Sequence, residues 1–245
     1  MPLPSDSAPR PPDDFAAVLA APEPLLVVGG QAVNLWALYY HKQTRDLAPF
    51  VSRDADVLGD RGTLELLGKL AGAKPQFFPM KPPSNEVGVV VATDTNGGAM
   101  IIEVLRYVKG ASNEELREPS YEFAIGGAQV RVRIPGPIAL LKAKVANLAE
   151  IDQKGRQDAR HVLILSRLLP AYLADLRASA AAGRLEERKL IDFLESLLAV
   201  VVSNDGRQAC AGLDLSAHDF FSGLDPMGLP KLKAFLKERL PRVLK

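Results

Sequence analysis

The sequence is poor in cysteine and histidine, and this shortage excludes several classes of site. Its 245 residues include one cysteine, Cys210, and three histidines. A single cysteine cannot form an internal disulfide or a cysteine-based zinc site. The histidines His41, His161 and His218 are far apart in the sequence, which argues against a histidine-rich metal centre. No Ser-His or Cys-His arrangement of the kind used in nucleophilic catalysis stands out.

The chain also lacks a marked net charge and a long apolar run. Lys and Arg number 30 against 29 Asp and Glu, a formal net charge of +1, so nothing attracts the whole chain to nucleic acid or membrane. The sequence still allows a local basic patch, because Lys and Arg cluster in the second half of the chain. No stretch is long and apolar enough to span a bilayer. Residues 1–12 lack a signal-peptide pattern. We expect a cytoplasmic protein without membrane contact.

The remaining composition is that of an ordinary globular protein, with 47% hydrophobic and 24% charged residues. The length suits one large domain or two modest ones. Five prolines in residues 1–12 predict a disordered or extended tail, and Pro135-Gly136-Pro137 marks a boundary. We expect an α+β protein with a mixed sheet flanked by helices over residues 13–135 and a helical domain over residues 136–245.

The most informative stretch covers residues 25–58. An apolar run over residues 25–28 predicts a strand, Gly29-Gly30 follows it, and apolar residues at helical spacing predict a helix over residues 31–40. Two glycines permit a tight turn and expose amides at a helix N-terminus, a place suited to phosphate. An ordinary strand-to-helix turn explains the pair equally well.

Three carboxylates occupy predicted strands. Asp54 and Asp56 are two residues apart, so their side chains point to the same face of a strand. Adjacent carboxylates repel each other unless a cation lies between them, and Mg²⁺ prefers oxygen ligands. Glu103 is the one charged residue of an apolar strand over residues 99–105 that follows an Asn-Gly hairpin signal. It binds a cation, pairs with Arg106, or faces water at a sheet edge.

A strand, a Gly-Gly turn, a helix and a strand with Ser-x-Asp-x-Asp together resemble the nucleotidyltransferase superfamily, whose fold is that of the DNA polymerase β palm. The AbiEii-type, toxin-like branch is the most similar, and the resemblance covers about residues 24–165. It implies catalytic metal ligands for two Mg²⁺ ions, namely Asp54, Asp56 and Glu103. It also implies contacts to a bound nucleotide from Gly29, Gly30, Ser52, Lys144 and Lys154.

The two lysines come from the helical half of the sequence. Lys144 lies on a predicted helix that follows Pro137, where the family supplies a lysine to the triphosphate; a solvated lysine on an amphipathic helix is the alternative. Lys154 opens a Lys-x-x-x-Asp segment that also resembles the family. At this spacing Lys154 and Asp158 would pair with each other along a helix, and we favour a structural role for Asp158.

The resemblance implies transfer of a nucleoside monophosphate from an NTP to an acceptor hydroxyl. For this branch the acceptor is RNA, particularly tRNA ends, or a protein, and the partner of the toxin is a cognate antitoxin. Two other interpretations stay open. One is a small-molecule nucleotidyltransferase of the aminoglycoside type. The other is a non-catalytic module of the same fold that binds a nucleotide or a partner, which Phe50 favours because the family often carries a basic residue there.

Overall fold

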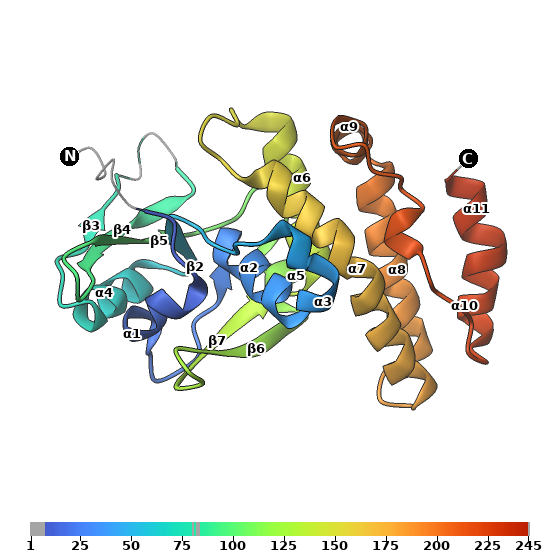
Figure 1. Ribbon diagram of the computed structural model, residues 1–245, viewed down its shortest axis with the longest axis horizontal. Helices are drawn as coiled ribbons and strands as arrows, with labels where there is room; N and C mark the ends of the chain where they lie inside the picture. The colour runs from blue at the N-terminus through green and yellow to red at the C-terminus, as the bar shows by residue number, and fades with distance from the viewer. Residues whose placement is uncertain (1–7, 80, 82–83, 245) are drawn as a thin grey trace. The chain divides into compact units, whose positions relative to one another are not determined.

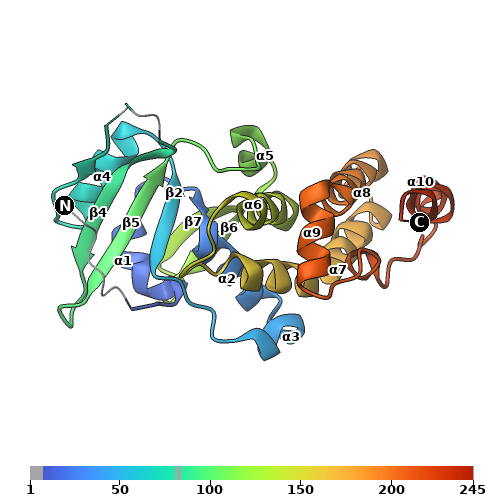
Figure 2. The same ribbon diagram turned by 90° about the horizontal axis from the view of Figure 1, so that it is seen from above.

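A five-stranded mixed sheet organises the first part of the chain in the computed structural model, which describes residues 8–79, 81 and 84–244. Its strand order is β1-β2-β5-β4-β3. The central pair, β2 and β5, is parallel, and every other pair is antiparallel. Figure 2 shows β4, β5 and β2 side by side. The strands are β1 (Val27–Val28), β2 (Asp54–Leu58), β3 (Gln76–Phe77), β4 (Glu86–Thr93) and β5 (Ala99–Leu105).

A separate hairpin of β6 (Ser120–Ile125) and β7 (Val130–Pro135) forms a two-stranded sheet. A single bridge joins it to the main sheet region, between Leu26 and Arg133. Short helices and α2 complete this part of the chain (Figure 1). They are η1 (Pro12–Phe15), α1 (Ala16–Leu19), α2 (Gly29–Tyr39), η2 (Arg45–Leu47), α4 (Arg61–Leu70) and α5 (Asn113–Arg117).

The predicted hairpin between β4 and β5 is confirmed, and its turn explains why the sequence signalled it. The Asp94 carboxylate accepts hydrogen bonds from the backbone N–H groups of Asn96 at 2.7 Å and Gly98 at 2.8 Å. Gly97 adopts a positive φ of 84°, a conformation that glycine reaches at little cost. The turn residues therefore fix the register that brings Glu103 to its place in β5.

Helix α5 was not predicted, because residues 106–119 suggested a charged loop. A capping box starts this helix: Ser112 Oγ accepts from the Glu115 N–H at 3.1 Å, and Glu115 accepts from the Ser112 N–H at 2.8 Å. Leu116 is fully buried and gives the helix one apolar anchor. The Ser-x-x-Glu signal was present in the sequence, but the surrounding charges concealed it.

The described part of the predicted tail, residues 8–12, contains an extended bridge at Arg10 and the first residue of η1. Residues 1–7 lie outside the described residues. Arg10 and Ser52 exchange two backbone hydrogen bonds, at 2.8 and 3.0 Å, and the Arg10 guanidinium lies 2.6 Å from the Asp94 carboxylate. The backbone pairing with Ser52 and the ion pair with Asp94 hold the segment at Arg10 in place. Both partners are far from Arg10 in the sequence.

The chain divides into two units, the first containing residues up to Tyr39 together with Asp46–Leu140, the second containing Tyr40–Arg45 together with Leu141 onward. The second break follows Leu140, inside a helix, whereas the sequence suggested a boundary at residue 135. In the second unit α3 packs on α7, which also packs on α8. Its helices are α3 (His41–Thr44), α6 (Pro137–Glu150, from Leu141 on), α7 (Asp158–Ala181), α8 (Glu187–Val202), α9 (Asn204–Gly212), η3 (Asp219–Phe221), α10 (Pro230–Ala234), the π-helical η4 (Phe235–Arg239) and α11 (Leu240–Val243).

The predicted fold class is confirmed: the protein is α+β, with a mixed sheet flanked by helices and a helical C-terminal part. Leucines at helical spacing form the helical core, with Leu165, Leu168, Leu194 and Leu197 fully buried. Among the described residues, no helix has both the length and the apolar character that a membrane crossing requires.

Replacement of Leu64, which is fully buried on α4, should lower stability sharply. Leu64→Ala leaves a cavity between α4 and the sheet, and we expect a loss of about 2–5 kcal/mol in the free energy of unfolding. The control Leu38→Ala makes the same change at a side chain that is 46% exposed and should cost about 0.5 kcal/mol or less. Urea unfolding followed by circular dichroism measures both, and equal losses would contradict the packing described.

Candidate active site

The Gly-Gly turn joins β1 directly to α2 without an intervening loop. Gly29 is the first residue of α2 and has a positive φ of 63°. Val28 pairs with Asp56 across the antiparallel β1–β2 ladder. The backbone at position 29 consequently lies against Asp56, and a Cβ at this position would overlap the Asp56 carboxylate. Glycine is required here both by its conformation and by the space that Asp56 occupies.

The three predicted carboxylates come from the two central strands. Asp54 and Asp56 begin and centre β2, and Asp56 pairs in register with Glu103 of the parallel strand β5. Residues in register on neighbouring strands share a face of the sheet, as do residues two apart on one strand. The sheet therefore presents all three carboxylates on one face. All three residues are half-buried.

The position of α4 identifies that face. A Cβ at Gly88 would meet the Leu64 side chain of α4, and Gly88 pairs with Val104. The face that contains Val104 is therefore packed against α4. Glu103 is the neighbour of Val104 and points the opposite way, and Asp56 points with it. The carboxylates lie on the sheet face away from α4, and helix α2, which packs on β2, begins against Asp56 at Gly29.

A buried polar cluster supports the start of β2. Ser52 Oγ donates a hydrogen bond to Asp54 Oδ1 at 3.1 Å and orients that carboxylate. The Gln31 side-chain amide donates to the backbone carbonyls of Arg10 at 3.1 Å and Ser52 at 3.4 Å. Asn34 in turn donates to Gln31 Oε1 at 3.2 Å. The contact of Ser52 to nucleotide stays a prediction.

Sequence reasoning missed Gln31 and Asn34. They are 1% and 0% exposed on α2, and Asn34 Oδ1 is buried without a partner among the described residues. The available signal was their spacing of three residues on an otherwise apolar helix, which places both amides on the same side. Two buried amides on such a helix indicate a structural or functional polar cluster, because unpaired burial is costly.

The donor set suits a hard divalent cation, since it consists of carboxylate oxygens, and Gly29 lets one of them lie against the backbone. Across residues 8–79, 81 and 84–244, however, no group of three or more His, Cys, Asp or Glu side chains is arranged to hold a metal ion. Three like charges repel one another without a cation between them. Residue types and strand register thus fit Mg²⁺, while the side chains themselves do not form a closed ligand set. Whether Asp54, Asp56 and Glu103 bind metal stays a prediction.

Lys144 belongs to the second unit and is buried in an ion-pair cluster. Its ammonium lies 2.9 Å from Asp158 Oδ1, and Arg156 lies 2.6 Å from the other carboxylate oxygen. Asn147 donates to Asp158 Oδ1 as well, at 3.3 Å. Burial alone would raise the pKa of Asp158, but the charges and hydrogen bonds of Lys144 and Arg156 outweigh it and lower this pKa to about 2. The favoured structural role of Asp158 agrees with this cluster, and nucleotide binding by Lys144 stays a prediction.

The expected pair between Lys154 and Asp158 is wrong. Helix α7 begins at Asp158, and the preceding residues form a loop, so a spacing of four residues does not bring the two side chains together. Both carboxylate oxygens of Asp158 are taken by Lys144 and Arg156. Lys154 is exposed, and its proposed contact to nucleotide stays a prediction.

His161 lies in the same region and is held neutral. Its side chain is 3% exposed, and both ring nitrogens lack a hydrogen-bond partner among the described residues. Burial, and then the positive charge of Lys144, lower the pKa of His161 well below its usual value near 6.5. The ring is a neutral part of the core at physiological pH.

Comparisons with known proteins give little beyond this geometry. No protein-family model matches the sequence, and no curated protein matches it. The structure is similar to the crystal structure of an antigenic nucleotidyltransferase-like protein from Paracoccidioides brasiliensis, with 14% sequence identity over 66% of this chain and 79% of that chain. The TM-score of 0.39 is too low for this match to identify the fold. The architecture therefore rests on the strands and helices of this chain itself.

The close approach of Gly29 to Asp56 predicts that Gly29→Ala is more damaging than an equivalent change elsewhere. Gly72 has a similar φ of 60° but open space where the Cβ of an alanine would lie, so Gly72→Ala isolates the backbone cost, about 1–2 kcal/mol. Gly29→Ala should add about 1–3 kcal/mol for displacing the carboxylate. Chemical denaturation of both variants measures the difference, and similar losses would mean that Asp56 moves aside freely.

The buried neutral His161 predicts a loss of stability in mild acid. Its folded-state pKa lies below the unfolded value of about 6.5, so stability is full above that pH and falls by up to about 1.4 kcal/mol per pH unit below it. The contribution of Asp158 is lost only below about pH 4, as the pH approaches its folded pKa of about 2. His161→Leu should flatten the decline between pH 6.5 and 4. Exposed His218 provides the control His218→Leu, which should leave the slope unchanged in urea unfolding measured across this range.

Proposed function

We propose that this chain is a metal-dependent nucleotidyltransferase that moves a nucleoside monophosphate from an NTP to an acceptor hydroxyl. The observation that carries the proposal is the alignment of Asp54, Asp56 and Glu103 on one face of adjacent parallel strands, beside the Gly29 turn. The sequence resemblance to the nucleotidyltransferase superfamily supports the same activity. Fold alone would not justify it, because one architecture serves many chemistries.

The proposed reaction needs no nucleophile from the protein. The acceptor oxygen forms a bond to the α-phosphorus of the NTP, the bond from that phosphorus to the β-phosphate oxygen breaks, and pyrophosphate leaves with the displaced electron pair. The hydroxyl proton passes to solvent. Two Mg²⁺ ions held by the three carboxylates would supply activation of the hydroxyl and charge neutralisation of the pyrophosphate. The scarcity of histidine and cysteine is compatible with such a reaction.

Each residue of the site has a separate task in this proposal. Asp56, lodged against Gly29, and Glu103, in register with it, form the centre of the cation site. Ser52 orients Asp54 through a hydrogen bond of 3.1 Å. Gly29 and Gly30 open helix α2, whose N-terminal amides favour a phosphate group. Catalysis would then depend mainly on position and charge.

The acceptor and the partner are narrower parts of the proposal. The toxin-like resemblance favours RNA, particularly tRNA ends, or a protein hydroxyl as acceptor, with a cognate antitoxin as partner. Lys144 and Lys154 are the proposed triphosphate contacts from the second unit. The burial of Lys144 against Asp158 weakens its part, because an ammonium that is already paired must give up that partner to meet a phosphate.

A second candidate is a non-catalytic module that binds a nucleotide or a partner protein. The specific observation in its favour is that the described His, Cys, Asp and Glu side chains do not form a group able to hold a metal ion. Metal-dependent nucleotide binding separates the two candidates. A catalytic site requires it, and a module that has lost its metal function does not show it.

Replacement of the central carboxylates should abolish transfer without unfolding the protein. Asp54→Asn and Asp56→Asn remove the charges that hold the cation, so we expect a loss of at least about 100-fold in labelled-NTP transfer. Calorimetric binding of each NTP should also lose its metal-dependent component in the double variant and in EDTA. Glu103→Gln tests the third ligand in the same assay. Asp46→Asn changes an exposed carboxylate outside the site and should keep both activities; full activity in Asp56→Asn would disprove the assignment.

A further inference from the structure

A cavity of about 1010 Å³ opens in the first unit at the carboxyl ends of the two parallel strands. Gly59 and Asp60 follow β2 and Arg106 follows β5, and all three residues line it. The Gly59 N–H donates to the Leu105 carbonyl at 2.9 Å, which keeps these strand ends together. Crevices at the carboxyl ends of strands are frequent ligand sites in α/β sheets. The three carboxylates of the proposed active site do not line this cavity.

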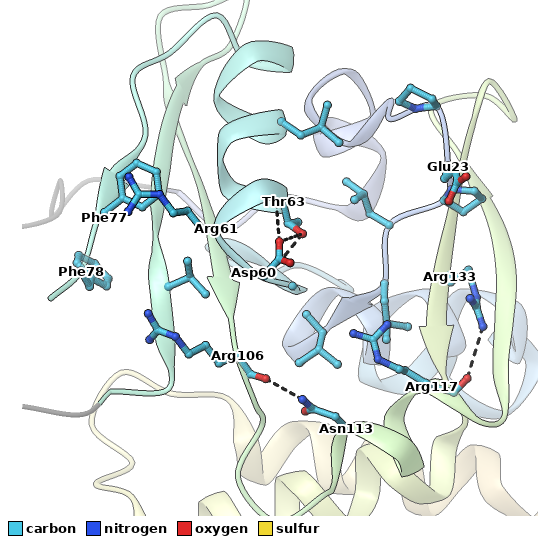
Figure 3. Close-up of a pocket in the computed structure, with 18 residues that line it drawn as sticks. Glu23, Asp60, Arg61, Thr63, Phe77, Phe78, Arg106, Asn113, Arg117 and Arg133 are labelled. Carbon is cyan, nitrogen blue, oxygen red and sulfur yellow. Dashed lines mark hydrogen bonds between the residues drawn. The ribbon is translucent and has the colours of Figure 1, made fainter. Parts of the chain in front are cut away.

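Arginines dominate the charge of this cavity. Four arginines and two carboxylates, Glu23 and Asp60, line it. Because Arg61 is paired with Glu65 at 3.2 Å, an excess of one positive charge remains in a chain whose formal net charge is +1. The arginines come from four separate segments of the chain and line different sides of the cavity, with Arg61 beside Phe77 and Arg133 on the opposite side (Figure 3). They are Arg61 at the start of α4, Arg106 after β5, Arg117 at the end of α5 and Arg133 in β7. We call this cavity the arginine pocket.

Three of these arginines lack a carboxylate partner among the described residues. Arg106 donates to the backbone carbonyls of Glu86 at 2.6 Å and Ser84 at 3.4 Å. Arg133 donates to Ser120 Oγ and, at 3.5 Å, to the Arg117 carbonyl. The Arg117 guanidinium has no hydrogen-bond or ion-pair partner within the described part of the chain, and Figure 3 shows it directed toward the interior of the pocket.

Five arginines elsewhere in the chain are paired with carboxylates across the fold or along the chain. Ion pairs at 4 Å or less join Arg10 to Asp94, Arg131 to Glu122, Arg156 to Asp158, Arg177 to Asp225 and Arg239 to Glu195. In the arginine pocket, by contrast, Arg106, Arg117 and Arg133 line one cavity without carboxylate partners among the described residues. Like charges at close range cost free energy, so such a cluster indicates an anionic ligand, and arginine is the preferred residue for phosphate.

Aromatic rings line the same pocket. Phe77 lies on the edge strand β3, is 38% exposed, and has the Arg61 guanidinium 4.2 Å from its ring centroid. Phe78 follows it in the lining. An exposed phenylalanine beside arginines offers a surface on which a planar ring stacks. The pocket thus combines recognition of phosphate with recognition of a flat ring.

We propose that the arginine pocket binds a free nucleoside polyphosphate at a site separate from the three carboxylates. The cavity has the size of small-molecule sites. Its arginines surround one cavity, whereas a nucleic-acid strand requires a basic track along which the backbone runs. The phosphates bind Arg106, Arg117 and Arg133, and the base lies against Phe77. This site needs no metal, so it does not depend on the nucleotidyl transfer proposed above.

Calorimetry of the full chain in EDTA tests the site, with a nucleoside diphosphate, a nucleoside triphosphate and inorganic tripolyphosphate as separate probes. Both nucleotides should bind without metal. Arg117→Gln should weaken binding by about tenfold, the value of one charge-assisted hydrogen bond. The control Arg131→Gln makes the same change at an exposed arginine outside the pocket lining and should leave the affinity unchanged. Phe77→Ala should weaken nucleotide binding but not tripolyphosphate binding.

Several outcomes would overturn the proposal. Absence of nucleotide binding in EDTA at millimolar concentration would do so, as would equal effects of Arg117→Gln and Arg131→Gln. Binding of a short single-stranded RNA that depends on Arg117, without binding of free nucleotides, would replace the small ligand by a nucleic acid. The double variant Asp54→Asn/Asp56→Asn should keep metal-free binding, so a failed active-site assignment and a failed pocket assignment give different results.

Discussion

The close approach of Gly29 to Asp56 is the constraint on which the candidate site depends. Strand β1 ends at Val28 and helix α2 begins at the next residue, Gly29, whose backbone lies against the Asp56 carboxylate. Any side chain at position 29 would overlap the Asp56 carboxylate, which is in register with Glu103. Ser52 then sets the direction of Asp54, and Gln31 holds the backbone of Ser52 against the segment at Arg10. The contact between the Gly29 backbone and the Asp56 carboxylate thereby connects the Gly-Gly turn and helix α2 to strand β2.

Local sequence patterns predicted much of the candidate site. The pairing of segments that are far apart in the sequence was not predicted. The period of two along a strand correctly put Asp54 and Asp56 on one face, and Asn96-Gly97 correctly predicted the β4–β5 hairpin. The register between Asp56 and Glu103, by contrast, depends on a crossover of more than forty residues, and no local rule fixes it. The same reason explains the segment at Arg10, whose partners are Ser52 and Asp94. The local rule failed for Lys154 and Asp158 because it assumed that both residues lie on one helix. Helix α7 begins at Asp158, so Lys154 precedes it.

Charge is nearly balanced over the whole chain and strongly separated within the first unit. The face away from α4 presents three carboxylates, while the carboxyl ends of the same two central strands lead into four arginines. Asp56 and Leu58 are two residues apart on β2, a distance of about 7 Å along a strand, and Leu58 already lines the arginine pocket. A net charge of +1 conceals this contrast. The two central strands thus connect the proposed cation site with the proposed anion site.

The division of the chain has a consequence for its synthesis. Neither unit is a continuous piece of sequence, because Tyr40–Arg45 belongs with the helices that follow Leu140. Tyr40 donates a hydrogen bond to Asp175 at 2.7 Å, and α3 packs on α7. The ribosome synthesises the segment Tyr40–Arg45 before residues 46–140. The helices on which this segment packs are synthesised only after residue 140. The first unit can form its sheet during translation, as domains commonly do. The second unit can pack α3 against α7 only after α7 has been synthesised.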